Sequence, residues 1–250
     1  MPRFVLVVPC YNEAGRLDVA AFRAASTLQP ELCFIFVNDG STDGTLALLE
    51  ALARELPERV RVVDLPKNVG KGEAVRQGML SAFSESVEVV GFWDADLSAP
   101  LSEVGPMRDL LVSTGAEIVM GARVKLLGRE ISRLPSRHYL GRVFATAASW
   151  VLEAPVYDTQ CGAKLFRNSE LNRSLFLEPF ESRWIVDVEI LARLIRALSA
   201  RGRPATLEGA VVEYPLHAWR HVAGSKVRPK DFGRAFFDLV AIRRSLKRRA

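Results

Sequence analysis

The chain has 250 residues, of which 49% are hydrophobic and 25% are charged, and its formal net charge is +5. This length and composition are typical of a folded globular protein with room for one large α/β domain. The three cysteines, Cys10, Cys33 and Cys161, are odd in number and show no ligand spacing, which excludes a disulfide framework or zinc site and indicates a reducing compartment. No apolar run approaches the roughly 18 residues that cross a bilayer, so no transmembrane helix is expected.

Strands and helices alternate through the first 96 residues. We predict strands over 3–9, 32–37, 60–65 and 87–93, with helices over 14–28, 45–56 and 73–83 between them. Short apolar strands alternating with helices are typical of an α/β protein with a parallel, doubly wound sheet. Ligands of such sheets bind beyond the carboxyl ends of the strands, so the segments that follow strands are the candidate sites.

The rest of the chain is less regular. Its predicted helices cover 101–114, 138–152, 183–198 and 231–247, its strands cover 117–121 and 210–214, and the segment 158–167 leads into a further strand. Residues 123–137 mix Arg, Gly, Ser and Pro without a period and are predicted to form a loop. The apolar helix over 138–152 is interpreted as a core helix or, alternatively, as a helix on a membrane surface. The sequence shows no repeat and no linker, so 1–250 is predicted to be one domain.

Two carboxylates follow the apolar strand predicted over 87–93. Asp94 and Asp96 lie two apart, so in a regular strand their side chains would share one face. Carboxylate oxygens at the carboxyl end of a sheet suit Mg²⁺ or Mn²⁺ that is held mainly by phosphate groups. The alternative interpretation is a strand end with two solvated acids that cap the next helix.

The loop Gly70-Lys71-Gly72 places a cation between two glycines where a helix begins, an arrangement that suits a diphosphate. The fingerprints of dinucleotide-binding and P-loop proteins are absent from the sequence, so a glycine-rich turn with a surface lysine is the alternative. Asp39 ends the second strand, where its carboxylate would accept a hydrogen bond from a nucleobase N–H or stabilise its own turn.

Charged residues in the second half of the chain suggest a further part of the candidate binding site. The predicted loop is surrounded by arginines, whose guanidinium groups suit bidentate recognition of phosphate: Arg123, Arg129, Arg133 and Arg137. Asp187 and Glu189 lie two apart on a helix and therefore point in different directions, so one would face a site while the other anchors it. A solvated loop and surface acids are the alternatives. The three histidines show no metal spacing and are predicted to be structural or exposed.

These motifs occur in one order and at one spacing, which gives them a joint meaning. The segments are PCYNE at 9–13, VNDGSTDGT at 37–45, NVGKG at 68–72 and DAD at 94–96. Together they resemble family 2 glycosyltransferases of the GT-A fold, a three-layer α/β/α sandwich, over about the first 125 residues. In the second half DTQCGAKLF at 158–166, RW with DVEIL at 183–191 and GSKV at 224–227 resemble the dolichyl-phosphate glucosyltransferase branch.

The resemblance implies a role for each motif residue. The nucleoside side would be formed by Pro9, Tyr11, Asn12, Glu13 and Asp39. Lys71 would contact the donor, and Asp94 and Asp96 would hold Mg²⁺ or Mn²⁺ on the diphosphate, with Asp96 the closer ligand. Arg123 with Arg133 or Arg137 would bind an acceptor phosphate. The sugar side would be closed by Gln160, Asp187 and Glu189, and the catalytic set would be Asp96, Arg123, Asp187 and Glu189.

The implied activity is metal-dependent, inverting transfer of a sugar to a polyprenyl or dolichyl phosphate, with UDP-glucose the preferred donor. Residues 1–125 would bind the nucleotide sugar, 126–218 the acceptor, and 219–250 would form a basic segment with ten Lys or Arg against two Asp. Members of this branch usually carry an N-terminal anchor, which this chain does not show. The helix over 138–152 and the basic C-terminal helix would then attach a cytoplasmic protein to the membrane face, and no nucleic acid partner is expected.

Two alternatives remain open. A sugar hydroxyl needs a general base to become a good nucleophile, and Asp187 would be that base in a transferase with a saccharide or other soluble acceptor. A phosphate monoester is already largely dianionic at neutral pH and needs arginines to position it, which the loop over 123–137 offers. The second alternative is a catalytically silent protein that binds membranes or nucleic acid through its basic tail.

Overall fold

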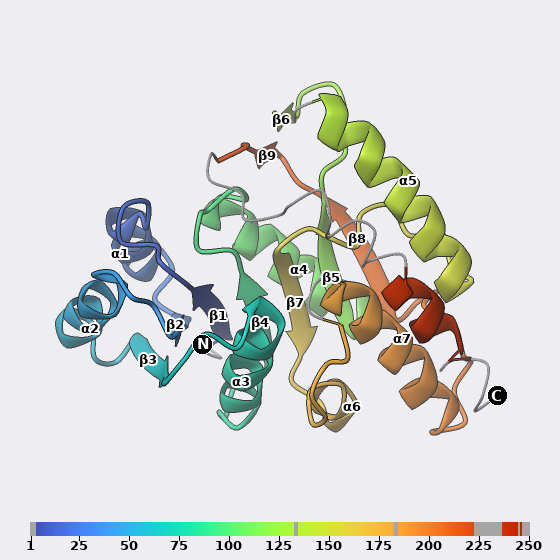
Figure 1. Ribbon diagram of the computed structural model, residues 1–250, viewed down its shortest axis with the longest axis horizontal. Coiled ribbons are helices and arrows are strands. Elements are labelled where there is room, and N and C mark those ends of the chain that lie inside the picture. The colour runs from blue at the N-terminus through green and yellow to red at the C-terminus, as the bar shows by residue number, and fades with distance from the viewer. Residues whose placement is uncertain (1–3, 133–134, 183–184, 223–236, 245, 247–250) are drawn as a thin grey trace.

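A seven-stranded sheet runs through the centre of the computed structural model, which describes residues 4–132, 135–182, 185–222, 237–244 and 246 (Figure 1). The sheet order is β3-β2-β1-β4-β7-β5-β8, and β7 alone runs against the other six strands. Its strands are β1 (Phe4–Cys10), β2 (Leu32–Asp39), β3 (Val60–Leu65), β4 (Val89–Trp93), β5 (Ile118–Ala122), β7 (Ala163–Arg167) and β8 (Val211–Pro215). A separate parallel pair joins β6 (Glu130–Ile131) to β9 (Ala218–Trp219).

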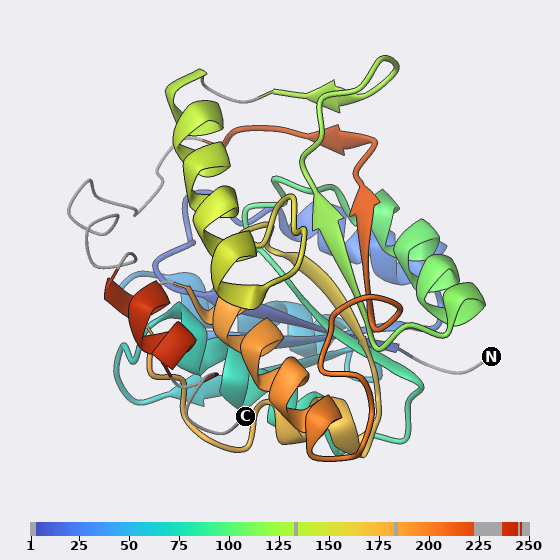
Figure 2. The ribbon, with the colours of Figure 1, turned by 90° about the vertical axis from the view of Figure 1, so that its right-hand side faces the viewer.

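Helices cover both faces of the sheet, because successive strand residues point to opposite sides and most are apolar. Leu6 packs in a core with α1 (Val19–Leu28), α2 (Thr45–Glu55) and α4 (Val104–Thr114). Its neighbour Val7 packs in the opposite core with α3 (Lys71–Phe83), α5 (Pro135–Leu152) and α7 (Val186–Ser199). Figure 2 shows α5 and α7 over the same face of the sheet. The predicted three-layer α/β/α sandwich with a mostly parallel sheet is confirmed.

Several predicted boundaries were wrong. The helix predicted from residue 14 begins at Val19, because the preceding residues form a turn and Asp18 accepts a hydrogen bond from the Ala21 N–H and so starts the helix there. The loop predicted over 123–137 contains β6 and the first turn of α5. Three short elements were not predicted, namely β6, α6 (Glu170–Ser174) and β9. The helix predicted over 101–114 begins with the 3₁₀ turn Leu101–Glu103 and continues as α4. Of the helix predicted over 231–247, residues 237–244 are helical and 231–236 lie outside the described residues.

Candidate active site

The candidate site lies at the sheet edge where the parallel strands end. The loop after β1 carries Tyr11 to Glu13, β2 ends at Asp39, the turn after β4 carries Asp94 and Asp96, and Arg123 directly follows β5. Figure 2 shows β5 and β8 pointing toward the same end, where the β6–β9 pair lies. The topology therefore gathers the predicted residues from segments more than 100 positions apart.

The loops after β1 and β2 are joined through Asn12. Its N–H donates to Ser41 Oγ at 3.0 Å, and its Oδ1 accepts from the Thr42 N–H at 2.8 Å. The neighbouring Glu13 is buried, its N–H donates to Thr45 Oγ1 at 2.8 Å, and its carboxylate pairs with Arg16, Nη2 to Oε1 at 2.6 Å. Asn12 and Glu13 thus shape the predicted nucleoside side, which half-buried Pro9 and Tyr11 flank.

Asp39 holds the glycine-rich loop before α3. Its buried carboxylate accepts from the Val69 N–H at 2.7 Å, from the Gly70 N–H at 3.0 Å and from Asn68 Nδ2 at 3.0 Å. The next residue, Gly40, has φ +60°, and a Cβ there would lie 2.3 Å from the backbone carbon of Lys67. Asp39 therefore has a structural task toward the loop over 68–70, whereas the sequence indicated one only in its own turn, and its contact with a nucleobase stays a prediction.

The two carboxylates of the Asp94-Ala95-Asp96 motif do not share a strand face as the regular-strand prediction had it. β4 ends at Trp93, so both acids lie in the turn beyond it. Asp94 forms an ion pair with Lys71, and its N–H donates to the Gly162 oxygen at 3.0 Å. Asp96 Oδ1 accepts from the Ser98 N–H at 2.9 Å. The two oxygen donors belong to one turn with different partners.

The Lys71–Asp94 pair sets the electrostatics of this turn. Burial opposes the charge of Asp94, but Lys71, with Lys164 and Arg123 farther off, outweighs it and holds the pKa of Asp94 below its usual range. The surrounding protein likewise opposes the charge of Lys71, although its side chain is 57% exposed, but Asp94, Asp187 and Asp96 outweigh it and raise the pKa of Lys71 above its ordinary value. Both groups are therefore charged at neutral pH.

Arg123 is oriented by an acid that the sequence analysis did not single out. Its Nε and Nη2 donate to Asp158 Oδ2 and Oδ1 at 2.6 and 2.7 Å, and its guanidinium lies 5.3 Å from the centre of the Trp219 ring. Asp158 is held in turn, since its N–H donates to Glu213 Oε1 at 2.7 Å. Burial opposes the charge of Arg123, but Asp158 outweighs it and raises the pKa of Arg123.

The other predicted acceptor arginines are placed differently. Arg133 lies outside the described residues, and Arg137 lies in the first turn of α5 instead of a loop, with its side chain outside the described part. The loop prediction failed there because Pro135 can begin a helix, its missing N–H being one that a first turn leaves unpaired anyway. Gln160 Nε2 is buried without a hydrogen-bond partner among the described residues, as an amide reserved for a ligand would be.

Asp187 and Glu189 diverge as predicted for residues two apart on a helix. Asp187 Oδ1 lies 2.6 Å from Lys164 Nζ, while buried Glu189 accepts from the Glu181 and Ser182 N–H groups and pairs with Arg193 at 2.7 Å. The contacts of Glu189 anchor the segment before α7, so Glu189 has a structural role. They offer no support for the predicted catalytic role of Glu189.

Lys164 is, after Asp158, a second residue that sequence reasoning missed. It is 1% exposed, it lies on β7 opposite Phe92, and its ammonium donates to the oxygens of Thr159 and Cys161 at 2.9 and 2.6 Å. The signal was a lysine among the apolar residues 163–166 of β7, because a buried ammonium requires a carboxylate partner. Lys164 fixes both Asp187 and the turn over 159–162.

The donor set can be compared with that of a metal site. Among the described residues no three His, Cys, Asp or Glu side chains gather as a ligand group. Burial raises the pKa of the Cys161 thiol to about 11, so in the absence of a metal this thiol is protonated at neutral pH. Two carboxylates in one turn nevertheless fit Mg²⁺ or Mn²⁺, which proteins bind through one or two carboxylates together with substrate phosphates.

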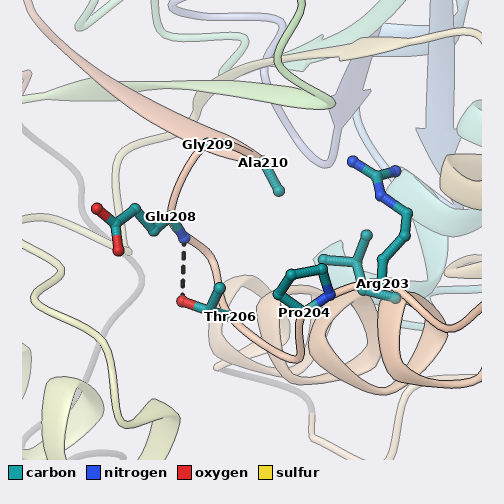
Figure 3. A pocket seen from close by; sticks show the side chains of 7 residues that line it. Arg203, Pro204, Thr206, Glu208, Gly209 and Ala210 are labelled. Carbon is teal, nitrogen blue, oxygen red and sulfur yellow. Dashed lines mark hydrogen bonds between the residues drawn. The ribbon is translucent and has the colours of Figure 1, made fainter.

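A cavity of about 380 Å³ lies at the amino-terminal end of β8, away from the candidate site (Figure 3). Arg203 and Glu208 are the charged side chains of its lining, and Arg203 already pairs with Glu117 at 2.9 Å. The Glu208 N–H donates to Thr206 Oγ1 at 3.2 Å, which closes the turn before β8. This cavity brings none of the predicted site residues together.

Comparison with known proteins identifies related chains. A family model described as glycosyl transferase family 2 matches residues 5–173. A dolichyl-phosphate beta-glucosyltransferase of Trichomonas vaginalis is 32% identical over 249 residues, which covers 94% of this chain and 69% of that protein. The dolichyl-phosphate beta-glucosyltransferase of Saccharomyces cerevisiae is 31% identical over 260 residues, and the match covers 95% of this chain and 73% of that protein. A glucosyl-3-phosphoglycerate synthase of M. tuberculosis shares the fold with a TM-score of 0.67 and 22% sequence identity. The match covers 98% of this chain and 80% of that structure.

Proposed function

The chain belongs to glycosyl transferase family 2, and on that premise we propose that it moves glucose from UDP-glucose to a polyprenyl or dolichyl phosphate. One observation carries the choice of substrates: relatives 31–32% identical over 94–95% of this chain are named dolichyl-phosphate beta-glucosyltransferases. The charged groups of the candidate site supply what such a transfer needs, namely cations for two phosphate groups and carboxylates for a metal.

The donor would bind along the loops after β1, β2 and β4. The synthase that shares the fold has been solved with Mn²⁺ and UDP-glucose, which supports a uridine nucleotide and a divalent ion as partners. Asp94 and Asp96 would hold the ion, which when bound neutralises charge on the leaving diphosphate. Lys71 would contact the same diphosphate, and Gln160, whose buried amide has no partner among the described residues, would donate to the sugar.

The acceptor phosphate would be positioned by Arg123, whose guanidinium Asp158 holds in a fixed orientation. A phosphate that is already dianionic can attack the anomeric carbon without losing a proton. Asp187 would orient groups in this transfer, because one of its oxygens already accepts from the Lys164 ammonium. If the acceptor were a hydroxyl, Asp187→Asn would abolish transfer, whereas it should only weaken transfer to a phosphate.

Attachment to a membrane surface would come from α5. In the described residues no helix is long and apolar enough to cross a bilayer. α5 buries Phe144, Ala148 and Val151 in the core and leaves large apolar side chains exposed: Tyr139, Leu140, Val143 and Trp150. An exposed apolar face near basic residues is suited to peripheral contact with anionic lipids.

A transfer assay tests the proposed function. Purified protein would be incubated with Mg²⁺ or Mn²⁺, radiolabelled UDP- and GDP-sugars, and a short polyprenyl phosphate in detergent, followed by extraction of the lipid phase. We expect label in the lipid phase from UDP-glucose. An empty lipid phase with UDP still released would contradict the lipid acceptor and favour a hydroxyl acceptor.

The metal assignment has its own test in the same assay. Because Asn keeps the shape of Asp96 but removes its charge, Asp96→Asn should lower transfer at least about tenfold at a fixed Mn²⁺ concentration. Asp109→Asn is the control, since Asp109 is exposed on α4 and pairs with Arg108 away from the site. Full transfer by Asp96→Asn with the metal present would show that the assignment is wrong.

A further inference from the structure

Two lysine–aspartate pairs lie in the candidate site, and they differ in how firmly the lysine is held. Lys164 is 1% exposed, and its ammonium contacts Asp187 Oδ1, the Thr159 oxygen and the Cys161 oxygen within 2.9 Å. These contacts use all three N–H donors of the ammonium. Lys164 therefore cannot leave Asp187 without losing three buried contacts.

The pair formed by Lys71 and Asp94 is built for exchange. The side chain of Lys71 is 57% exposed and that of Asp94 is 32% exposed. Within the described part of the chain, Asp94 is the one hydrogen-bond partner of the Lys71 ammonium. An ion pair with this exposure contributes little net stability and can open at small cost.

Asp94 itself is fixed, so the lysine is the partner that moves. The Asp94 N–H donates to the Gly162 oxygen at 3.0 Å, and a Cβ on Gly162 would lie 1.9 Å from Asp94 Oδ2. The Asp94 carboxylate thus packs directly on a backbone that Lys164 holds in place through Cys161. Lys71, by contrast, enters from the start of α3 on an exposed, flexible stem.

We propose that the Lys71 ammonium is paired with the Asp94 carboxylate in the free protein, and that a divalent ion arriving with a nucleoside diphosphate displaces this ammonium from Asp94. The inference rests on the proposed function and deepens it. Once displaced, Lys71 exchanges the carboxylate for a phosphate oxygen of the same ligand, so its charge stays paired. Metal binding to the protein alone is opposed by Lys71, and the ion enters together with the nucleotide.

The test is Mn²⁺ binding to the full chain, followed by the electron paramagnetic resonance signal of free Mn²⁺, with and without UDP. Lys71→Met removes the ammonium and keeps most of the stem. Lys67→Met is the matched control, because Lys67 is exposed just before the same helix and forms no ion pair with the described residues. Circular dichroism would establish that each variant is folded.

We expect wild type to bind Mn²⁺ weakly alone and more tightly with UDP. Lys71→Met should bind Mn²⁺ alone about tenfold more tightly than wild type, because a competing positive charge beside the ion is gone. Lys71→Met should also bind UDP less tightly than wild type. The factor by which UDP strengthens Mn²⁺ binding, and Mn²⁺ strengthens UDP binding, should therefore be smaller in this variant. Lys67→Met should match wild type in every measurement.

Two results would overturn the exchange, and they are distinguishable. Unchanged or weaker Mn²⁺ affinity of Lys71→Met without UDP would overturn it while leaving the proposed transfer reaction standing, provided that wild type still binds Mn²⁺ with UDP. If wild type bound no Mn²⁺ even with UDP, the exchange and the metal-dependent part of the proposed function would fail together. UDP binding measured by calorimetry without metal would then show whether the nucleotide site itself exists.

Discussion

At the scale of single residues, the turn over 159–162 decides the position of Asp94. The turn is tied by two hydrogen bonds from the Lys164 ammonium, and the Asp94 carboxylate packs against its Gly162, where a Cβ would lie 1.9 Å from Asp94 Oδ2. A buried ammonium with all its donors used is a rigid support, because each lost contact would leave a buried polar group unpaired. The carboxylate is thereby presented in one orientation, which a metal or substrate site requires.

Gly162→Ala tests this support. The added methyl group cannot coexist with the Asp94 carboxylate, so we expect transfer to fall about 100-fold, as a displacement of about 1 Å at a reacting centre can produce. The free energy of unfolding should fall by about 1–3 kcal/mol from overpacking. Gly105→Ala on α4 is the control, because a Cβ there meets nothing within 4 Å; it should leave transfer unchanged and, as a Gly→Ala change in a helix, raise the free energy of unfolding by up to about 1 kcal/mol. A fully active Gly162→Ala would show that Asp94 tolerates displacement.

Cys161, in the same turn, makes the free energy of unfolding of the protein depend on pH. Burial raises the pKa of Cys161 to about 11 in the folded protein, against an ordinary value near 9.0. Between these values the folded thiol keeps a proton that the unfolded thiol releases, so its contribution to stability is present below pH 9 and is lost as pH rises toward 11. The loss by pH 11 should approach about 2 kcal/mol.

Urea unfolding at several pH values from 7.5 to 11, for wild type and Cys161→Ala, isolates this contribution. Other groups, including Tyr214 with its pKa raised to about 12 by burial beside Glu103, titrate in both proteins and cancel in the difference. The stability advantage of wild type should narrow above pH 9. If the difference in unfolding free energy between wild type and Cys161→Ala stayed constant from pH 7.5 to 11, the raised pKa assigned to Cys161 would be contradicted.

At the scale of elements, the alternation of strands and helices was sufficient to predict β1 to β4, α2 and α3, because each short apolar strand is followed by a turn with Gly, Asn or Asp. The insertion of β7 between β4 and β5 could not be predicted, since local patterning does not specify which strands pair. The ion pairs of Arg123 with Asp158 and Lys164 with Asp187 join residues 35 and 23 positions apart in sequence, so they depend on tertiary packing that local patterning does not specify. Sequence motifs predicted the residues of the candidate site, and tertiary packing set their partners.

Helix α5 carries a prediction of its own. Its exposed Tyr139 and Val143 lie one turn apart on the side away from the core, so Tyr139→Ser with Val143→Asp should remove most binding to anionic vesicles while leaving the fold intact. Val112→Asp is the control, because Val112 is equally apolar and 50% exposed but lies on α4, across the sheet. Vesicle co-sedimentation would measure the effect. Equal loss in both variants, or none in either, would exclude α5 as the membrane-facing element.

At the scale of the whole molecule, charge and apolar surface are unevenly distributed. The segment 219–250 carries a net charge of +8, which leaves −3 for residues 1–218. The described part of its helix, residues 237–244, reaches α5, because the Arg243 guanidinium lies over the Trp150 ring at 3.1 Å from its centre. The exposed side chains Phe237 and Val240 belong to the same helix. Residues 237–244, with Arg243 and Arg244, are therefore neighbours of α5, and we expect them to approach a lipid surface together with its apolar face.

This arrangement predicts that membrane binding depends on salt while catalysis does not. Raising the salt from about 0.1 M to about 1 M shortens the screening length from about 10 Å to about 3 Å, which removes most of the attraction between basic residues and anionic lipids. We expect vesicle binding to fall at least about tenfold over this range, and to need anionic lipid at low salt. Transfer to a short polyprenyl phosphate in detergent should change far less, because Arg123 is held by Asp158 in a partly buried pair. Vesicle binding that ignored both salt and lipid charge would assign attachment to the apolar face of α5 alone.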